Sequence, residues 1–394
     1  MSDSDSDEQQ PLLECSVSET AKYLRGVPAA RGLLRAIKAT WQSVPYGKRR
    51  SAGAGRDAEE SGEGSGESDG DDGGGRAKPK RAAERSSSDP KRDRLRRRQW
   101  KEQIALNLPI QYIACLELHQ YMQENGCNVA LFARRDCGIL IKIWRLLYPD
   151  IPAVYLHCSR ALFNEARRTH NRDYREYIRG VVSKAGGPRR CVFVDVHGTG
   201  QRMIRYFASE WQGAVPFCYL VSAGPASARK MPSESARHHR KGRLDALVWG
   251  VGGSPIEMLN YDLVGSASGF ADGRVKREPL EYPKDLVSPA HDCAEEFVRQ
   301  LAKYQDKAHL APDLDHDKLR EAAEWLMDKL RDRRRKPIIS TVIEHVRNHE
   351  RKKQEDEEEQ QARKSGDATS SSGKDRQRKH RSRKSRKHTK KRRH

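Results

Sequence analysis

Apolar residues follow two alternating patterns through the central part of the chain. Short continuous apolar runs predict buried strands at 128–133, 153–157, 192–195 and 215–221. Apolar positions at helical spacing predict helices at 109–125, 139–148, 173–184 and 203–211. Strands that alternate with helices are typical of a mostly parallel sheet covered on both faces. The pattern therefore predicts an α/β fold, a three-layer sandwich.

The pattern changes after the fourth predicted strand. Residues 223–243 are polar and predict a long loop, and Pro255 predicts the start of a helix. Further on, apolar residues at helical spacing predict a helical C-terminal part, with helices at 293–304, 318–330 and 338–346. Near the N-terminus, a smaller apolar set predicts one short helix at 18–42.

Composition limits how much of the 394 residues can fold. The segments 50–100 and 350–394 contain few large apolar side chains, so burial cannot offset their ordering entropy. We therefore expect three regions. Residues 1–100 are mostly disordered, acidic and then basic, 101–345 form the α/β domain, and 346–394 form a disordered, strongly basic tail.

The charge of the chain is +21, and it is unevenly distributed. Residues 374–394 hold 13 Lys and Arg against one Asp, a net +12. Such a segment binds nucleic acid through counterion release, or serves as a nuclear localisation signal, and composition leaves both open. No apolar run approaches the roughly 20 residues of a membrane span, so we expect no membrane association. The eight cysteines lack CxxC spacing, which indicates reduced thiols in the nucleus or cytoplasm.

The richest motif is Cys191–Arg202, a strand followed by an acid, a Gly/Thr loop and a helix. Such a loop aims backbone N–H groups and a helix N-terminus at one point, which favours a phosphate. Asp195 ends the strand, and Gly198, Thr199 and Gly200 would cradle the phosphate. A turn of ordinary geometry with Asp195 as a cap is the alternative.

Two other predicted strands end at the same edge, because the carboxyl ends of parallel strands coincide. Arg135 and Arg160 follow these strands, and arginines there suit a second phosphate or a carboxylate. The competing interpretation is an internal pair, such as Arg160 with Asp136 or Asp195. Further candidate site residues are Asp136, Ser159 and Glu257, although Glu257 also suits a helix cap.

The loop resembles that of type I phosphoribosyltransferases, in which a strand and two acids precede a turn and Thr-Gly. Asp195 stands four residues before Thr199 and matches the second acid, whereas Val194 replaces the first. Gly198 replaces the Asp that faces the ribose. This resemblance implies that the loop binds a phosphoribosyl 5-phosphate or a nucleotide, with Mg²⁺ at Asp195. It also implies that the Arg-and-Gly loop 134–138 lies where pyrophosphate binds.

The same loop also resembles the first motif of haloacid-dehalogenase-type phosphatases, Asp-x-Asp-Gly-Thr. Here Asp195 would attack phosphorus, His197 would stand in for the second Asp, and Mg²⁺ would neutralise charge. Ser222 would be the second motif, and Gly253 replaces an Asp of the late metal-binding motif.

Over about 105–300 the chain resembles a poorly characterised α/β domain. That domain follows haloacid-dehalogenase domains in bacterial, phage and large-virus proteins. The resemblance rests on landmarks that occur in the same order and implies an Arg/Asp/Glu-lined polar site without an established activity. The landmarks are Leu108-Pro109, Phe132-Ala-Arg-Arg-Asp136, Tyr155-Leu-His-Cys-Ser-Arg160, Val194-Asp-Val-His-Gly-Thr-Gly-Gln201, Ile256-Glu-Met-Leu259 and Gly265-Ser-Ala-Ser-Gly-Phe270. A third hypothesis is a non-enzymatic, nucleic-acid-associated nuclear or virion protein with a degenerate core.

Overall fold

The chain divides into two compact units. A computed structural model describes residues 18–25, 27, 29–44, 90–224, 231–250, 255–280, 284–305, 307–311, 314–331, 348 and 351. The helical unit combines the described parts of Met1–Asn125, Ile139–Ile151 and Pro289–Lys329. The sheet unit combines Gly126–Gly138 and the described parts of Pro152–Ser288 and of Leu330–His394. The two units interleave along the chain.

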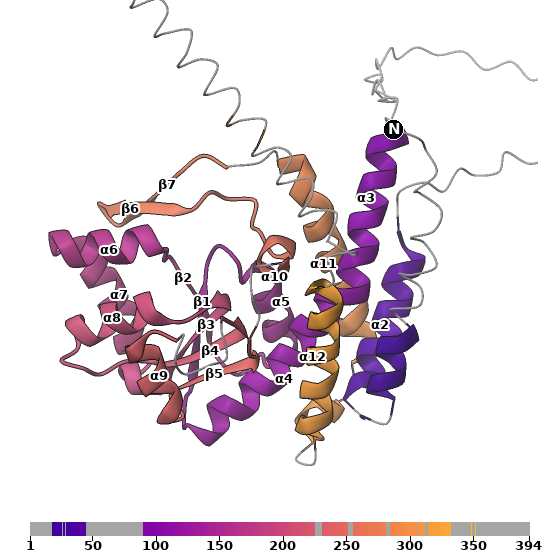
Figure 1. Cartoon of the computed structure of the whole chain (residues 1–394), viewed down its shortest axis with the longest axis horizontal. Coiled ribbons are helices and arrows are strands. Elements are labelled where there is room, and N and C mark those ends of the chain that lie inside the picture. The colour runs from indigo at the N-terminus through magenta and orange to yellow at the C-terminus, as the bar shows by residue number, and fades with distance from the viewer. Residues whose placement is uncertain are drawn as a thin grey trace, which may run out of the picture. The chain divides into compact units, whose positions relative to one another are not determined.

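The sheet unit is built on five parallel strands (Figure 1). They are β1 (Val129–Ala133), β2 (Ala153–Leu156), β3 (Cys191–Gly198), β4 (Phe217–Ala223) and β5 (Leu244–Val248), in the order β2-β1-β3-β4-β5. Phe132 of β1 lies in register with Tyr155 of β2 on one side and with Val194 of β3 on the other. The strands β1, β2 and β3 run parallel to one another. A parallel sheet with helical connections confirms the predicted α/β class.

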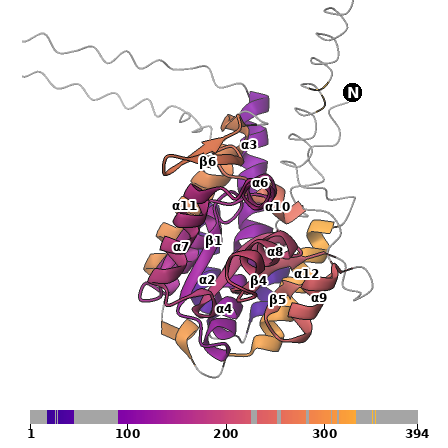
Figure 2. The same ribbon diagram turned by 90° about the vertical axis from the view of Figure 1, so that its left-hand side faces the viewer.

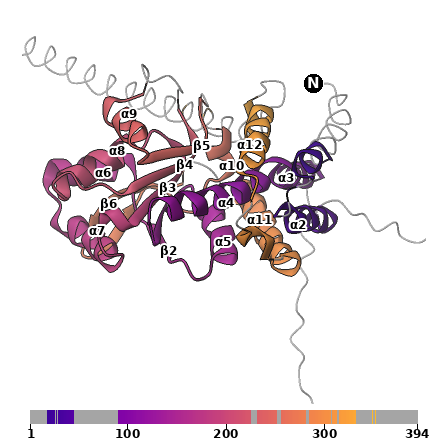
Figure 3. The same cartoon turned by 90° about the horizontal axis from the view of Figure 1, so that it is seen from below.

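Helices connect the strands of this unit. They are α6 (Arg160–Thr169), α7 (Arg172–Lys184), α8 (Gln201–Glu210), α9 (Ser233–Arg240) and the short α10 (Pro255–Leu259). Helices α6, α8 and α9 lie side by side, with α8 in contact with both others (Figure 2). Figure 3 shows α8 and α9 along one face of the sheet, where α9 contacts β5.

Two parts of the sheet unit differ from the sequence prediction. The loop predicted over 223–243 contains α9, whose polar sequence Ser-Glu-Ser-Ala-Arg-His-His-Arg hides the buried Ala236 and Ser235. The fifth strand, β5, was not predicted, and neither was the antiparallel hairpin of β6 (Ala267–Ala271) and β7 (Arg274–Arg277). The hairpin strands carry few apolar residues for periodicity to reveal them, whereas β5 is a short apolar run that Asp245 interrupts.

The strand order reverses next to β1. The chain passes from β1 to β2 on one side and then continues through β3, β4 and β5 on the other. Loops that leave two neighbouring strands in opposite directions open a crevice at the carboxyl edge, and ligands of such sheets bind there. The switch point lies between β1 and β3, which carry the predicted Arg135–Asp136 and Asp195 loops.

The helical unit contains α2 (Ala30–Gln42), α3 (Pro90–Glu102), a π-helical turn (Gln103–Asn107), α4 (Leu108–Glu124) and α12 (His316–Arg331). Most of α5 (Gly138–Leu147) and of α11 (Lys284–Tyr304) also belongs to it. Helix α3 begins eleven residues before residue 101, the predicted start of the domain. Its residues Gln99 and Trp100 are buried, and Trp100 Nε1 donates to Thr40 O at 3.4 Å. Buried Glu117 of α4 accepts hydrogen bonds from Arg320 and His316 of α12.

Several sequence predictions fall outside the described residues. These include the helix at 338–346, nearly all of the basic tail 346–394 and most of residues 1–100. The seven cysteines within the described residues are all free thiols, and six of them are buried. Among the helices that the structure describes, none combines the length and apolar character needed to cross a bilayer.

Candidate functional site

Asp195 lies near the carboxyl end of the central strand β3. Its Oδ1 accepts a hydrogen bond from the next backbone amide, Val196 N, at 2.9 Å. Burial raises the pKa of this carboxyl group, and so do the negative charges of Asp136 and Glu257, while Arg135 opposes them. Three acidic side chains therefore interact at the switch point, and Asp195 holds a proton more readily than an ordinary aspartate.

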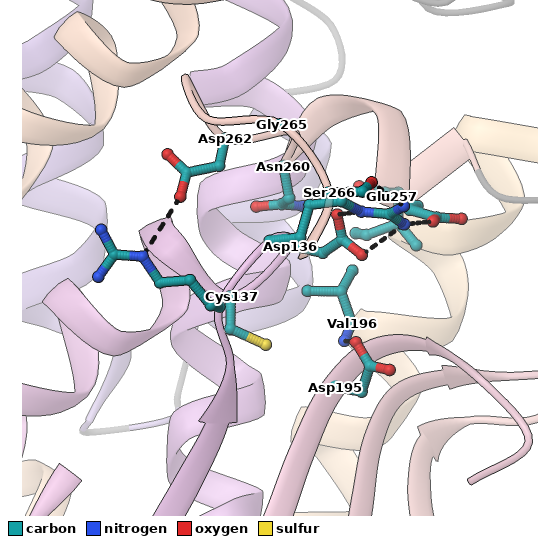
Figure 4. Close-up of polar contacts among 12 residues, drawn as sticks. Asp136, Cys137, Asp195, Val196, Glu257, Asn260, Asp262, Gly265 and Ser266 are labelled. Carbon is teal, nitrogen blue, oxygen red and sulfur yellow. Dashed lines mark hydrogen bonds and ion pairs between the residues drawn. The ribbon is translucent and has the colours of Figure 1, made fainter. Parts of the chain in front are cut away.

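Arg135 is the positive centre of this acidic group. Its Nε donates to Asp136 Oδ1 at 2.6 Å and its Nη2 to Asp136 Oδ2 at 2.8 Å, a two-pronged pair. Nη2 also donates to Glu257 Oε1, which joins the β1 loop to α10 (Figure 4). Asp136 and Glu257 thus occupy the guanidinium of Arg135, a group proposed from the sequence to bind a ligand anion. An internal arginine–carboxylate pair therefore exists at Arg135, whereas the example given from the sequence was Arg160.

Residues far along the chain complete the cluster around Arg135. Ser266 Oγ lies 3.5 Å from Arg135 Nη1, and the guanidinium lies 5.8 Å from the ring centroid of Tyr261. Asp262 is ion-paired with Arg134 at 3.9 Å (Figure 4). The segment 260–266 thus lies against the loop after β1. The sequence prediction missed its three contact residues, because no local pattern links them to a loop more than 120 positions earlier.

His197 lies on β3 beside β4, hydrogen-bonded to Ser222. The His197 Nδ1 to Ser222 Oγ distance is 2.8 Å, and Ser222 Oγ in turn donates to Val196 O at 3.2 Å. In the arrangement where the hydroxyl donates to the carbonyl, Nδ1 of the imidazole donates to Ser222 Oγ, which leaves Nε2 as an acceptor in the neutral ring. Burial lowers the pKa of His197, and the charge of Arg160 lowers it further, against the effect of Glu257. The lowered pKa favours the neutral imidazole.

The Gly198–Thr199–Gly200 loop joins β3 to α8. Gly200 has φ 66°, and a Cβ there would lie 3.0 Å from Cys218 Sγ and 3.1 Å from Leu244 Cδ1. Both the backbone conformation and the packing therefore require glycine. Within the described chain, no side chain caps α8 and its first turn carries no acidic residue, so its first N–H groups lack a side-chain acceptor.

Glycines also continue the two neighbouring strands at this edge. Gly224 N donates to Gly198 O at 3.1 Å, and Gly250 N donates to Gly224 O at 3.2 Å. The ladder of β3, β4 and β5 thus ends in a row of three residues without side chains. A ligand can approach a backbone of this kind more closely than any side-chain-bearing strand end allows.

Ser159 and Arg160 have different roles at the end of β2. Ser159 Oγ accepts from Leu162 N at 2.9 Å and donates to Ala267 O at 2.5 Å, so it caps α6 and holds the hairpin. Arg160, the first residue of α6, is exposed. Among the described residues it forms no ion pair, so the predicted pairing with Asp136 or Asp195 is absent there. It lies within electrostatic range of His197.

A metal ion has a limited set of ligands at this edge. In the described part of the chain, no three His, Cys, Asp or Glu side chains are arranged to hold an ion. Mg²⁺ usually takes one or two carboxylates and fills its other positions with water and substrate phosphates. Asp195 is the carboxyl group here that fits this smaller requirement, because both oxygens of Asp136, in the loop after β1, already accept hydrogen bonds from Arg135.

The predicted site residues therefore fall into three groups. The charges of Asp136, Asp195, Glu257 and Arg135 interact at the switch point, and His197 is influenced by Glu257. The Gly198–Gly200 loop and Arg160 lie at the same edge, whereas Ser159 has a capping role.

No protein-family model matches this chain, and no curated protein is significantly similar to it.

Proposed function

We propose that the sheet unit binds a phosphorylated small molecule, such as a nucleotide or a phosphoribosyl compound, between the ends of β1 and β3. The observation that carries the proposal is the placement of the Asp195–Asp136 pair at the switch point, next to an uncapped helix. Ligands of parallel sheets bind at this position, and a helix N-terminus favours an anion. The phosphoribosyltransferase-like interpretation follows from the same residues.

Each part of the edge has a role in this proposal. The phosphate lies on the N–H groups of Gly198–Gly200 and the first turn of α8. Arg160, exposed at the start of α6, faces a second anionic group. Asp195 would hold Mg²⁺ together with the ligand's phosphate oxygens, and the ion would supply charge neutralisation. The charge of Glu257 acts on Asp195, so Glu257 is the candidate for the acid that the transferase interpretation requires in place of the missing one at Gly198.

A phosphohydrolase of haloacid-dehalogenase type is the second candidate. Two observations favour it: Asp195 has a second carboxylate, Asp136, nearby, and His197 offers an unprotonated Nε2. In that reaction Asp195 attacks phosphorus in its ionised form, and His197 moves the proton of the leaving group or of the water. The raised pKa of Asp195 means that a cation is needed to ionise it at neutral pH.

A third candidate belongs to a different class. The chain would be a nuclear, cytoplasmic or virion protein that binds nucleic acid through its basic tails, and the sheet unit would be a degenerate relative of the uncharacterised α/β domain. The support for it is the net +12 of residues 374–394, which lie outside the described residues. Binding by such a tail depends on salt and not on the edge of the sheet.

Calorimetric titration of the full chain tests the first proposal. The probes are ribose 5-phosphate, AMP and phosphoribosyl pyrophosphate, each with and without Mg²⁺. Thr199→Val removes only a hydroxyl group from the loop, and Thr169→Val removes one from α6 as a matched control. We expect saturable binding that Mg²⁺ strengthens, that Thr199→Val weakens several-fold, and that Thr169→Val leaves unchanged.

The same samples separate the three candidates. Release of inorganic phosphate that is lost in Asp195→Asn supports the phosphohydrolase, whereas binding without hydrolysis supports the transferase-like site. Absence of saturable binding by any probe, beside intact nucleic-acid binding, refutes a phosphate site and leaves the degenerate-core interpretation.

A further inference from the structure

Positively charged and N–H-bearing side chains gather at the carboxyl end of β2. Arg134 follows β1, His157 follows β2 and Arg277 ends β7, and we call these three the β2-end cluster. Arg277 Nη2 lies 3.0 Å from His157 Nδ1, and the guanidinium of Arg134 lies 4.3 Å from the ring centroid of Tyr155. Three distant segments of the sheet unit thus converge on one place.

The hydrogen bonds fix which atoms of the β2-end cluster can donate. An arginine only donates, so His157 Nδ1 must accept from Arg277, and the proton of the neutral imidazole therefore resides on Nε2. Arg277 Nη1 donates to Gly265 O at 2.8 Å, which holds the guanidinium in place. Arg134 Nε is buried and has no hydrogen-bond acceptor among the described residues. The cluster therefore presents donors whose acceptors are incomplete.

The β2-end cluster contains more positive than negative side chains. Within the described residues, the ion-paired carboxylate is Asp262, whose Oδ2 lies 3.9 Å from Arg134 Nε, too far for a hydrogen bond. Burial lowers the pKa of Arg277, and the charge of Arg134 lowers it further, against the opposing effect of Asp262. Burial likewise lowers the pKa of His157, followed by the charges of Arg277 and Arg134. Like charges held together in this way gain from an added anion.

We infer that the β2-end cluster is a second anion subsite, which binds a phosphate or pyrophosphate group of the same ligand. This inference rests on the proposed function, because it assigns the other end of that ligand. Strand β1 separates β2 from β3, so the two strand ends lie roughly 10 Å apart. The ligand class is then a compound with two phosphate-bearing ends, in which the group between them passes Asp136 and Asp195.

Histidine signals report on the two subsites separately. The full chain, labelled at histidine side chains, is titrated with inorganic phosphate and then pyrophosphate, and the imidazole resonances are followed by NMR. His157 reports on the β2-end cluster and His197 on the phosphate loop, and His157→Gln and His197→Gln assign the two signals. We expect saturable shifts of both resonances, with pyrophosphate binding the β2-end cluster more tightly than phosphate.

Variants identify the groups responsible. Arg134→Gln and Arg277→Gln should each weaken the His157 response about tenfold or more, as expected for loss of a charged hydrogen-bond donor, and leave the His197 response intact. Arg277→Lys, which keeps the charge, should retain part of the response. Arg274→Gln is the matched control, because Arg274 is an exposed arginine on the same strand.

Every pattern of results is informative. A shift of His197 without a shift of His157 overturns the second subsite and leaves the proposed function standing. A shift of His157 alone supports the subsite and removes the phosphate loop from the proposed function. If neither resonance responds up to millimolar anion, both ideas are wrong, and a His157 response that survives both glutamine variants refutes the assignment to this cluster.

Discussion

Two histidines at the same sheet edge hold opposite tautomers, because their neighbours differ. Ser222 Oγ donates a hydrogen bond to Val196 O, and in that arrangement His197 donates through Nδ1 and keeps Nε2 as an acceptor. Arg277 can only donate, so His157 accepts through Nδ1 and keeps its proton on Nε2. The same residue type therefore suits proton removal at the end of β3 and anion binding at the end of β2.

At the residue scale, Asp195→Asn should change how stability depends on pH. The folded pKa of Asp195 is raised from 3.8 to about 8, so the native state holds a proton that the unfolded chain has released. Stability of the wild type therefore falls as pH rises through this window. Asparagine cannot ionise and can still accept from Val196 N. We expect the variant to equal the wild type near pH 4 and to exceed it increasingly as pH rises to 8, by about 1.4 kcal/mol for each unit by which folding raises the pKa.

The measurement is urea denaturation of both proteins between pH 4 and pH 8, in EDTA to exclude divalent cations. Asp245→Asn is a matched control, because Asp245 Oδ1 accepts from the next amide, Ala246 N, at 2.8 Å, as Asp195 does. A stability difference between Asp195→Asn and the wild type that is constant over the whole pH range would contradict the raised pKa.

At the element scale, the β6–β7 hairpin is held to helices α6 and α7 at the edge of the sheet that carries the site. Ser159 donates to Ala267 O, Asn171 Nδ2 donates to Phe270 O at 3.0 Å, and Asp272 N donates to Asp173 Oδ2 at 2.8 Å. Phe270 also stacks on Tyr177 of α7, with ring centroids 5.0 Å apart. The hairpin and α6–α7 therefore hold the loop that contains Ser266 next to Arg135.

Two substitutions should weaken the attachment of the β6–β7 hairpin to different extents. Ser159→Ala removes the cap of α6 and the bond to β6, which costs about 1–2 kcal/mol. Asn171→Asp keeps the cap oxygen that accepts from Tyr174 N but loses the donor to Phe270 O. We expect faster hydrogen exchange of the hairpin amides in both variants, measured by mass spectrometry, and fraying of α6 in Ser159→Ala only. Unchanged hairpin exchange in both would show that the stacked aromatic rings suffice.

The elements also show how far the sequence could predict this structure. Strand β3 was recognisable because its buried run is continuous from Cys191 to Val194, and its loop chemistry follows directly at the strand end. Strand β5 was not predicted, because Asp245 interrupts an apolar run that is otherwise continuous from Leu244 to Val248. The partner of Arg135 could not be chosen in advance, since Glu257 lies 122 positions later and suited a helix cap equally well.

At the scale of the whole molecule, charge and site chemistry belong to different parts of the chain. The acids that interact at the switch point all lie in the sheet unit, whereas residues 374–394 carry a net +12 out of +21. An anionic polymer bound by the tail releases counterions in proportion to the phosphates neutralised. A small phosphorylated ligand at the sheet edge would instead depend on a few fixed groups.

Deletion of residues 374–394 should therefore separate the two kinds of binding. For a single-stranded oligonucleotide, log K falls with log salt concentration by roughly 0.7 per phosphate contact. Removal of the tail should make this slope distinctly shallower and weaken binding at low salt about tenfold or more. Fluorescence anisotropy at several salt concentrations measures both quantities.

A tail of the same composition in scrambled order should bind as the wild type does, and Asp195→Ala should leave the slope unchanged. If truncation does not alter the slope, polyanion binding lies elsewhere, and the basic block from Arg76 to Arg98 is then the segment to remove.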